Sequence, residues 1–255
     1  MIRYEVKEGV AVVALARPER LNALTFEMRE ALAGWFEQAA RDDKVRSVLL
    51  RGEGRAFCAG GDVGSIADST PEANAEVGKM SHRMILNLVD IQKPVIVAVR
   101  GAVAGIGWSL ALACDIVLAS DNAKFAQVFR NIGLVPDGGA VWFLTRYVGA
   151  LRAKELVFSG RRVEAQEALS LGLATRVVAD AELDAVGWQT ALDYASAPTR
   201  ALGAGKKLFR FVHQPDLVAL LEVEAAAQAT AIRSFDHREG IAAFLEKRPA
   251  RFEGR

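Results

Sequence analysis

The stretch that decides the fold is residues 94–119, Pro-Val-Ile-Val-Ala-Val-Arg-Gly-Ala-Val-Ala-Gly-Ile-Gly-Trp-Ser-Leu-Ala-Leu-Ala-Cys-Asp-Ile-Val-Leu-Ala. A β-branched run at 95–99 and a second apolar run at 116–119 predict two buried strands. Between them, three glycines lead into the apolar segment 108–114, which predicts a glycine-rich turn that feeds a buried helix. The first N–H groups of such a helix have no partner within the helix. They are suited to bind a negative oxygen, either on a phosphate or on a carbonyl that becomes an oxyanion.

Two kinds of site are compatible with this glycine turn. Gly105-Ile106-Gly107 after a strand is part of a dinucleotide-binding fingerprint, but Leu110 stands where the third glycine belongs. An oxyanion hole instead needs a second backbone donor from another loop. Residues 52–64 supply a second glycine-rich turn directly after an apolar strand. The pair of turns favours an oxyanion hole over dinucleotide binding.

The composition is ordinary for a single α/β domain with a small appendage. Of 255 residues, 51% are hydrophobic and 25% are charged, with a net charge of +1. This charge balance argues against nucleic-acid binding, and the absence of any long apolar run argues against a membrane span. The N-terminus lacks signal-peptide features, and Cys58 and Cys114 lie in apolar segments without metal-ligand spacing. We therefore expect a reduced, cytoplasmic protein without a metal site.

The first part of the chain shows clear periodicity. Alternation predicts a hairpin over 2–15, and apolar residues on one face predict a helix over 26–41, followed by a strand over 46–51. Residues 64–76 are small and polar, which predicts a mobile flap beside the site. A helix near 77–91 then leads to the central stretch.

The second part of the chain changes from mixed structure to helices. We expect a short strand near 124–126, helices at 138–148 and 150–158, a helix after Val163, a strand near 174–178, and helices at 181–196, 199–212, 216–234 and 237–246. These patterns divide the chain into a mixed α/β core with the candidate site, residues 1–196, and a helical region, residues 197–255.

Motifs over nearly the whole chain resemble the crotonase (enoyl-CoA hydratase/isomerase) superfamily. They occur in the order Arg17-Pro-Glu-Arg-Leu-Asn-Ala-Leu24, Arg55-Ala-Phe-Cys-Ala-Gly-Gly-Asp62, Lys93-Pro94, Gly101 to Asp115, Gly133-Leu-Val-Pro136 and Gly240 to Arg248. The resemblance implies a spiral of ββα units with a C-terminal helical trimerisation region. It also implies a homotrimer, or a hexamer built as a dimer of trimers.

The resemblance implies acyl-CoA chemistry through a thioester enolate, with coenzyme A as part of the substrate and no separate cofactor. By motif position, the N–H groups of Gly61 and Ile106 form the oxyanion hole. The two glutamates of an enoyl-CoA hydratase would stand at Ser109 and Phe129. Neither side chain is a carboxylate base, and this argues against an ordinary hydratase.

Asp137, within Gly133-Leu-Val-Pro-Asp-Gly-Gly139, is the remaining acid near these motifs. Apolar neighbours would raise its pKa, whereas a helix N-terminus would lower it. Taken alone, Asp137 is equally well explained as the cap of the helix at 138–148. The segment is similar to that of the branch that includes the ring-1,2-epoxyphenylacetyl-CoA isomerase of phenylacetate breakdown, where this aspartate is catalytic. The resemblance therefore implies an isomerase in which Asp137 moves the proton.

The resemblance also implies which residues hold coenzyme A. Family position puts the adenine and pantetheine near Arg20, Leu21, Ala23, Ala59, Gly61, Asp62 and Val63. Phe244 and Lys247 match positions that reach the coenzyme A of a neighbouring subunit. Capping of its own loop explains Asp62 equally well, and solvation at a helix end explains Lys247. The histidines His82, His213 and His237 have no partner at metal-ligand spacing, so we expect surface or core positions for them.

Other functions stay open at this point. The fold class also supports an enoyl-CoA hydratase of fatty-acid β-oxidation, hydrolysis, decarboxylation or dehalogenation, and a non-catalytic partner subunit. The presence of Asp137 together with both glycine loops favours an enzyme, and specifically an isomerase.

Overall fold

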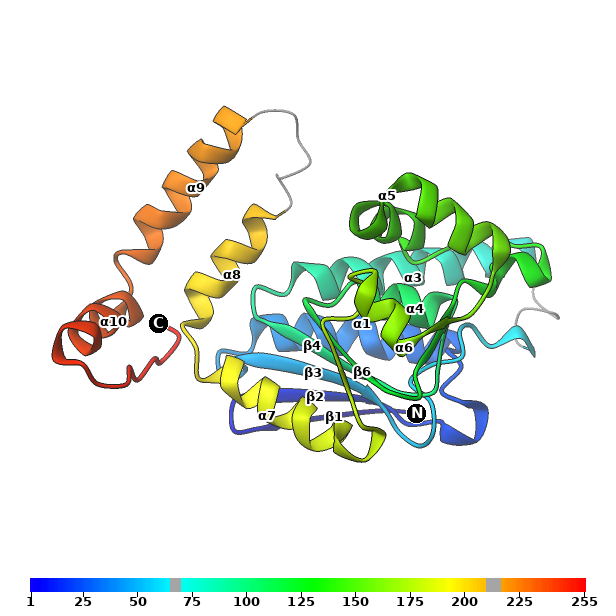
Figure 1. Cartoon of the computed structure of the whole chain (residues 1–255), viewed down its shortest axis with the longest axis horizontal. Coiled ribbons are helices and arrows are strands. Elements are labelled where there is room, and N and C mark those ends of the chain that lie inside the picture. Colours follow the sequence, from blue (N-terminus) through cyan, green and yellow to red (C-terminus); the bar gives the residue numbers. More distant parts are fainter. Residues whose placement is uncertain (65–69, 210–216) are drawn as a thin grey trace.

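A six-stranded sheet forms the centre of the protein (Figure 1), and the computed structural model describes residues 1–64, 70–209 and 217–255. The strands stand in the order β1-β2-β3-β4-β6-β9. Their bounds are β1 (Ile2–Lys7), β2 (Val10–Leu15), β3 (Ser47–Gly52), β4 (Val95–Val99), β6 (Ile116–Ser120) and β9 (Arg176–Val178). Strands β1 and β2 pair antiparallel, as the predicted hairpin requires, and the other neighbouring pairs are parallel.

Helices cover both faces of this sheet, namely α1 (Phe26–Arg41), α3 (Pro71–Asp90), α4 (Ile106–Leu112) and α7 (Leu183–Ala195). In β4, Val95, Val97 and Val99 belong to the core shared with α1, α3 and α4. Ile96 and Ala98 point the other way, into the core shared with α7. A strand that is buried on both sides reads as a continuous apolar run, which is the pattern that predicted β4.

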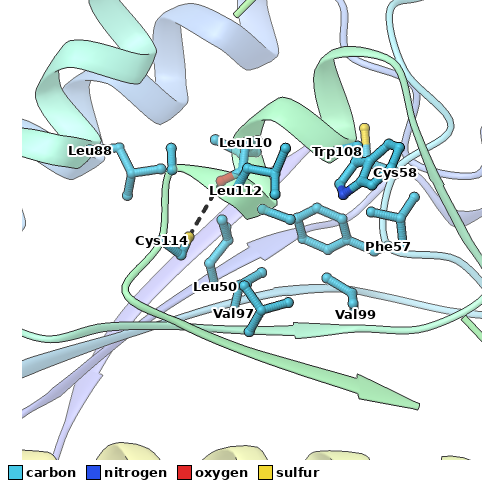
Figure 2. Close-up of a cluster of buried hydrophobic side chains, with 14 of the residues drawn as sticks. Leu50, Phe57, Cys58, Leu88, Val97, Val99, Trp108, Leu110, Leu112 and Cys114 are labelled. Carbon is cyan, nitrogen blue, oxygen red and sulfur yellow. Dashed lines mark hydrogen bonds between the residues drawn. The ribbon is translucent and has the colours of Figure 1, made fainter. Parts of the chain in front are cut away.

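Helix α4 is anchored to the sheet by large apolar side chains. Figure 2 shows its buried side chains over those of β3 and β4, with Leu50, Val97, Val99, Trp108, Leu110 and Leu112 among the residues drawn. The thiol of Cys114, just after the helix, lies 3.4 Å from the carbonyl oxygen of Leu110. This packing anchors α4 over the central strands β3 and β4.

A second, three-stranded sheet lies beside the glycine turn and was not predicted as a sheet. It consists of β5 (Ala102–Ala104), β7 (Lys124–Ala126) and β8 (Val163–Glu164), in the order β5-β7-β8. Only β7 was expected. Three residues between glycines show no periodicity, so β5 has no signal of its own in the sequence.

Helix α3 begins earlier than the sequence predicted. Thr70 caps it, with Oγ1 accepting the N–H of Ala73 at 3.2 Å, and Pro71 takes the first helical position. Residues 71–76 are therefore helical, and their assignment to a flap was wrong. The remaining core of the predicted flap, residues 65–69, lies outside the described residues.

The later helices follow the predicted order. Helix α5 (Ala140–Ser159) contains both expected helices, and Gly149, with φ 75° and ψ 161°, separates them. The remaining helices are α6 (Ala165–Ser170), α8 (Thr199–Leu208), α9 (Leu217–Ala231) and α10 (Phe235–Glu246), with short 3-10 turns at Pro18–Arg20, Val128–Ile132 and Asp180–Glu182. Figure 1 shows α8 to α10 extending to one side of the core. Within the described ranges, no helix combines the length and apolar character needed to cross a membrane.

Candidate active site

The two glycine-rich turns lie side by side. They follow β3 and β4, which are adjacent and parallel, so both turns leave the sheet at the same edge. The N–H of Cys58 donates to the carbonyl oxygen of Ala102 at 3.0 Å, and the N–H of Ala104 donates to the carbonyl oxygen of Cys58 at 2.9 Å. A Cβ placed on Gly105 would lie 3.8 Å from the Cα of Gly60. The structure thus brings together the two loops that the sequence paired.

Each loop turns at a glycine with positive φ, 111° at Gly60 and 53° at Gly105. Side chains rarely adopt this conformation, and a Cβ on Gly60 would also press against the Ala104 carbonyl at 3.3 Å. The next N–H groups belong to Gly61 and Ile106. Ile106 opens α4, so its N–H has no acceptor within the helix. Across the described ranges, neither N–H is hydrogen-bonded to the protein. Both are available to an incoming oxygen.

Cys58 fills the space behind these donors. A Cβ on Gly107 would lie 2.7 Å from the Cys58 sulfur, so glycine is needed for the close approach. Cys58 is fully buried, and burial raises the pKa of its thiol to about 12. The thiol therefore stays protonated and acts as a packing group, in agreement with the sequence interpretation (Figure 2).

A third loop packs against the first one and gathers the residues predicted to hold coenzyme A. Leu24 pairs with Gly61 in a parallel bridge, and the N–H of Ala59 donates to Leu21 at 2.9 Å. Arg20, Ala23, Asp62 and Val63 belong to the same pair of loops. The structure therefore places this whole predicted group at the first glycine-rich loop, residues 52–64, and the loop packed against it.

Asn22 fixes the third loop, and sequence reasoning missed this role although the residue stands in a quoted motif. Its buried amide donates to the carbonyls of Glu53 and Ala56 at 2.9 and 2.8 Å, and its Oδ1 accepts the N–H of Arg17. Its φ of 56° is a conformation that asparagine tolerates better than most residues. A conformation of that kind leaves no periodic signal in the sequence.

Asp62 ties two loops together. Its carboxylate accepts from the guanidinium of Arg17 at 2.5 Å and from the N–H of Gly64 at 3.2 Å. The loop-capping interpretation of Asp62 is therefore confirmed.

Phe244 and Lys247 are not brought to these loops within one chain. Phe244 lies near the end of α10 and Lys247 caps it, and α10 extends away from the core that contains α4 (Figure 1). Phe244 is 83% exposed, and Lys247 ends the helix in a left-handed conformation with φ 54°. A role at a neighbouring subunit remains a prediction.

Asp137 lies on the turn that packs against the start of α4. The hydroxyl of Ser109 donates to the backbone carbonyl of Asp137 at 3.0 Å. A Cβ on Gly138 would lie 3.1 Å from the side chain of Ile106. The predicted acid and the predicted oxyanion donor at Ile106 are thus neighbours.

The side chain of Asp137 does not cap helix α5. The helix begins at Ala140, its cap residue is Gly139, and no side chain caps it. The capping alternative was wrong because Gly138 and Gly139, both with positive φ, delay the helix by two residues. Among the described residues, the buried Oδ1 of Asp137 has no hydrogen-bond partner.

The electrostatic surroundings of Asp137 suit a proton carrier. Burial raises the pKa of its carboxyl, while the charges of Arg29 and His82 and its own N–H act in the opposite direction. The pKa nevertheless ends above the ordinary value for aspartate. A carboxyl group of this kind can take up a proton and release it again.

The two positions of the hydratase glutamates carry no acid. The buried Ser109 hydroxyl is engaged with backbone carbonyls, lying 3.4 Å from that of Gly105 in addition to its bond to Asp137. The ring of Phe129 covers Gly105, 3.6 Å from the position that a Cβ would take. Neither residue can activate a water molecule as a carboxylate does.

Two charged residues near Asp137 were missed by sequence reasoning. Arg29 lies on the buried face of α1, three and seven residues before the core residues Leu32 and Phe36. That spacing puts it on the apolar stripe and was a readable signal. His82 of α3 is exposed, as the sequence predicted, and nothing in its spacing indicated an electrostatic influence on Asp137.

Known proteins match this chain over its whole length. The family described as enoyl-CoA hydratase/isomerase matches residues 5–255. The chain is 40% identical over 258 residues to 1,2-epoxyphenylacetyl-CoA isomerase of Escherichia coli, covering 100% of this chain and 98% of that protein. It is 39% identical over 254 residues to a protein of Rhodobacter capsulatus named "Probable enoyl-CoA hydratase", with the same coverage. The crystal structure of an enoyl-CoA hydratase from Bacillus anthracis matches with a TM-score of 0.95 and 31% identity, covering 100% of this chain and 99% of that chain.

The fold and the paired glycine loops define an α/β protein of the crotonase type. The chain belongs to the enoyl-CoA hydratase/isomerase family, which confirms the family and the fold class predicted from the motifs. Relatives that bear hydratase names and relatives that bear isomerase names both match. The choice between the two reactions therefore depends on the residues of the site.

Proposed function

We propose that this protein is an acyl-CoA isomerase that shifts a double bond, or draws off a ring valence isomer, through a thioester enolate. The observation that carries the proposal is the distribution of carboxylates. Asp137 lies beside Ile106 with a free Oδ1, whereas Ser109 and Phe129 occupy the positions of the two hydratase glutamates. One carboxylate suffices to move a proton between carbons, while hydration also needs a group that activates water.

The oxyanion hole stabilises the charge that builds up on the thioester oxygen. The N–H groups of Gly61 and Ile106 are the proposed donors, and their freedom from other acceptors in the described structure supports this role. Loss of one such donor typically costs about 10²–10³ in rate. Coenzyme A enters as part of the substrate, and the proposed chemistry uses no separate cofactor.

Asp137 carries the proton. For a 3-enoyl thioester, its carboxylate takes a proton from C2, and the electron pair of that bond spreads over a dienolate that ends at the thioester oxygen. The resulting carboxylic acid then returns the proton to C4, the double bond settles between C2 and C3, and the carboxylate is regenerated. The raised pKa of Asp137 supports this shuttle, because burial makes the protonated form of the carboxyl easier to reach than in an ordinary aspartate.

Coenzyme A is proposed to lie along the loops that carry Arg20, Leu21, Ala23, Ala59, Asp62 and Val63. We further propose that the chain assembles as a homotrimer or as a dimer of trimers, in which Phe244 and Lys247 reach a neighbouring subunit's coenzyme A. The exposed apolar side chains Val218, Leu221 and Phe244 on α9 and α10 support an assembly of some kind.

The test compares two substrates with three proteins. The substrates are 3-hexenoyl-CoA and trans-2-hexenoyl-CoA, and the proteins are the wild type, Asp137→Asn and the control Asp43→Asn, which makes the same change at an exposed turn. We expect the wild type and Asp43→Asn to form the conjugated thioester from 3-hexenoyl-CoA, and Asp137→Asn to lose this activity. Neither active protein should add water to trans-2-hexenoyl-CoA.

Rapid hydration of trans-2-hexenoyl-CoA would instead favour the hydratase function that the Rhodobacter capsulatus relative's name suggests. Full activity of Asp137→Asn would remove Asp137 from the mechanism. Inertness toward both substrates, together with binding of both, would contradict double-bond isomerisation of simple enoyl thioesters.

A further inference from the structure

The helices α8 to α10 lie outside the two apolar cores of the protein. Across the described ranges, these cores contain no residue beyond Ala195. Helix α8 has a polar anchor of its own, because Lys206 pairs with Asp115 at 2.7 Å. Among the described residues, the hydrogen bonds that join residues 235–255 to the α/β core are those of Arg46. Arg46 is therefore the polar link between α10 and the core.

Arg46 stands directly before β3, at the edge of the sheet opposite to the glycine turn that follows this strand. Its side chain is half-buried, and each nitrogen of its guanidinium has an acceptor. Nε donates to Oγ1 of Thr199 at 2.7 Å, and Nη2 donates to the carbonyl oxygen of Ala197 at 2.8 Å. Nη1 and Nη2 also donate to the carbonyl oxygen of Phe252, each at 3.4 Å. One guanidinium thus holds the start of α8 and the chain after α10 at the same point of the core.

Residues 251–255, hereafter the strap, fold back on α10. Asp236 in the first turn of this helix is only 3% exposed, and its carboxylate accepts the N–H groups of Glu253 at 2.7 Å and Gly254 at 2.9 Å. The carboxylate of Glu239, about one turn further on, accepts the N–H of the first strap residue at 2.8 Å. Hydrogen bonds to a carboxylate are stronger than those between neutral groups. The strap and the first turns of α10 therefore form one unit, which Arg46 joins to the core.

The contact between the strap and Arg46 requires glycine. Gly254 has a φ of +78°, and a Cβ on this residue would lie 2.8 Å from Nε of Arg46. Gly172, after α6, has a similar φ of +72°, but a Cβ there would meet nothing within 4 Å. An alanine would cause similar backbone strain at either position. Only the alanine at position 254 would also push the strap away from Arg46.

We propose that Arg46 is a positioning residue that, through the strap, sets the orientation of α10 and thereby the place of Lys247. The inference rests on the proposed function, in which Lys247 reaches the coenzyme A of a neighbouring subunit. Helix α10 has 12 residues, and a helix of this length spans about 18 Å. A tilt of about 10° at its first turn moves the far end by roughly 3 Å, which is enough to break a hydrogen bond. Arg46 therefore acts on coenzyme A binding from the edge of the sheet opposite to the candidate site.

The test measures the binding of butanoyl-CoA, a saturated thioester with no double bond to shift, by calorimetry. Arg46→Met and Gly254→Ala open the contact from its two sides, and Gly254→Ala keeps the arginine if Arg46→Met does not fold. Lys247→Ala removes the cation that these variants would displace. The controls are Gly172→Ala and Arg161→Met, which removes a half-buried arginine that forms ion pairs with α5 and α6.

We expect Lys247→Ala, Arg46→Met and Gly254→Ala to raise the Kd of butanoyl-CoA severalfold and by similar factors, while both controls bind like the wild type. Adding Lys247→Ala to Arg46→Met should weaken binding no further, because the two residues act through one contact. Arg46→Lys should keep part of the affinity, since it keeps the charge but loses the planar fork. Hydrogen exchange of the Glu253 and Gly254 amides should be faster in Arg46→Met, with the exchange of β3 and β4 unchanged.

Wild-type affinity in a folded Arg46→Met protein, or unchanged exchange of its strap amides, would overturn the inference. Independent losses that multiply in the double variant would overturn it as well. If Lys247→Ala alone weakened binding, the contact across subunits would stand without the role of Arg46. Unchanged affinity in Lys247→Ala would remove that contact from the proposed function, and this inference with it. Because butanoyl-CoA has no double bond, the proton transfer by Asp137 is tested separately from all these outcomes.

Discussion

The hydroxyl of Ser109 donates to the backbone carbonyl of Asp137 at 3.0 Å. The residue in the first hydratase-glutamate position thus holds the turn that carries the proposed proton carrier. The contact is tight, since a Cβ on Gly138 would lie 3.0 Å from the Cβ of Ser109. We therefore predict that Ser109 positions Asp137 through this bond to its backbone.

Replacement of this serine tests that role. Ser109→Ala should lower the free energy of unfolding by about 1 kcal/mol and reduce kcat by tenfold or less, because the bond it removes positions Asp137 and transfers no proton. Urea unfolding and isomerase assays measure the two effects. Ser170→Ala is the control, since it removes an exposed serine–carbonyl bond on α6 and should leave activity unchanged. Complete loss of activity at unchanged stability would assign the proton transfer to Ser109.

A substitution at Gly105 tests the proposed oxyanion hole through the backbone and leaves every other side chain in place. Its φ of 53° and ψ of −128° suit glycine alone, and it precedes the proposed donor at Ile106. Gly105→Ala should therefore reduce kcat by about 10²–10³, the usual effect of losing one donor. The control is Gly34→Ala on α1, where a Cβ meets nothing within 4 Å.

The control change should stabilise the protein by about 0.5–1 kcal/mol through helix propensity and leave turnover intact. Steady-state kinetics and thermal unfolding provide both readouts. Wild-type turnover in a folded Gly105→Ala protein would exclude the N–H of Ile106 as a donor.

The pH dependence of activity follows from the surroundings of Asp137. Burial raises the pKa of this carboxyl, and Arg29 of α1 and, to a smaller extent, His82 of α3 oppose that rise. Because the base must be ionised, kcat/KM should increase with pH around a midpoint above the ordinary aspartate value of about 3.9. Arg29→Met should move the midpoint upward, and His82→Gln should move it upward by less. A midpoint that stays unchanged in Arg29→Met would show that the charge of Arg29 does not influence the pKa of Asp137.

The free energy of unfolding should change with pH in the opposite direction to kcat/KM. Below the ordinary aspartate pKa, both folded and unfolded chains hold the proton, so Asp137 causes no penalty. As the pH rises toward the raised folded pKa, the unfolded chain ionises first, and the folded state loses stability relative to it. Asp137→Asn should remove this decline, which denaturant titrations at several pH values can measure.

Periodicity predicted the sheet and the long helices because their signals are local. The apolar run of β4 and the amphipathic face of α1 each lie within one stretch of chain, and the Thr25 cap defines the start of α1. Strand β5 was not predicted because it has only three residues. The start of α3 was not predicted because its first turns consist of small and polar residues.

The site was predictable only in part. The glycine loops and Asp137 were found because they follow recognisable strand ends and motifs. The electrostatic influence of Arg29 and His82 on Asp137 was not predicted, because it depends on α1 and α3 packing side by side. In this packing the Asn87 amide donates to the Ala33 carbonyl at 2.9 Å. Contacts between residues so distant in sequence are set by the tertiary fold, which no local pattern encodes.

The last prediction concerns assembly and coenzyme A. If Lys247 reaches the coenzyme A phosphates of a neighbouring subunit, Lys247→Ala should raise KM for a full CoA thioester severalfold and leave kcat unchanged. The same variant should show no change with a pantetheine thioester, which lacks the adenosine phosphates. Lys154→Ala, at an exposed position of α5, is the matched control. Sedimentation velocity should show a trimer or hexamer for each protein. A monomer that turns over normally, or an equal KM increase with both thioesters, would contradict the phosphate contact across subunits.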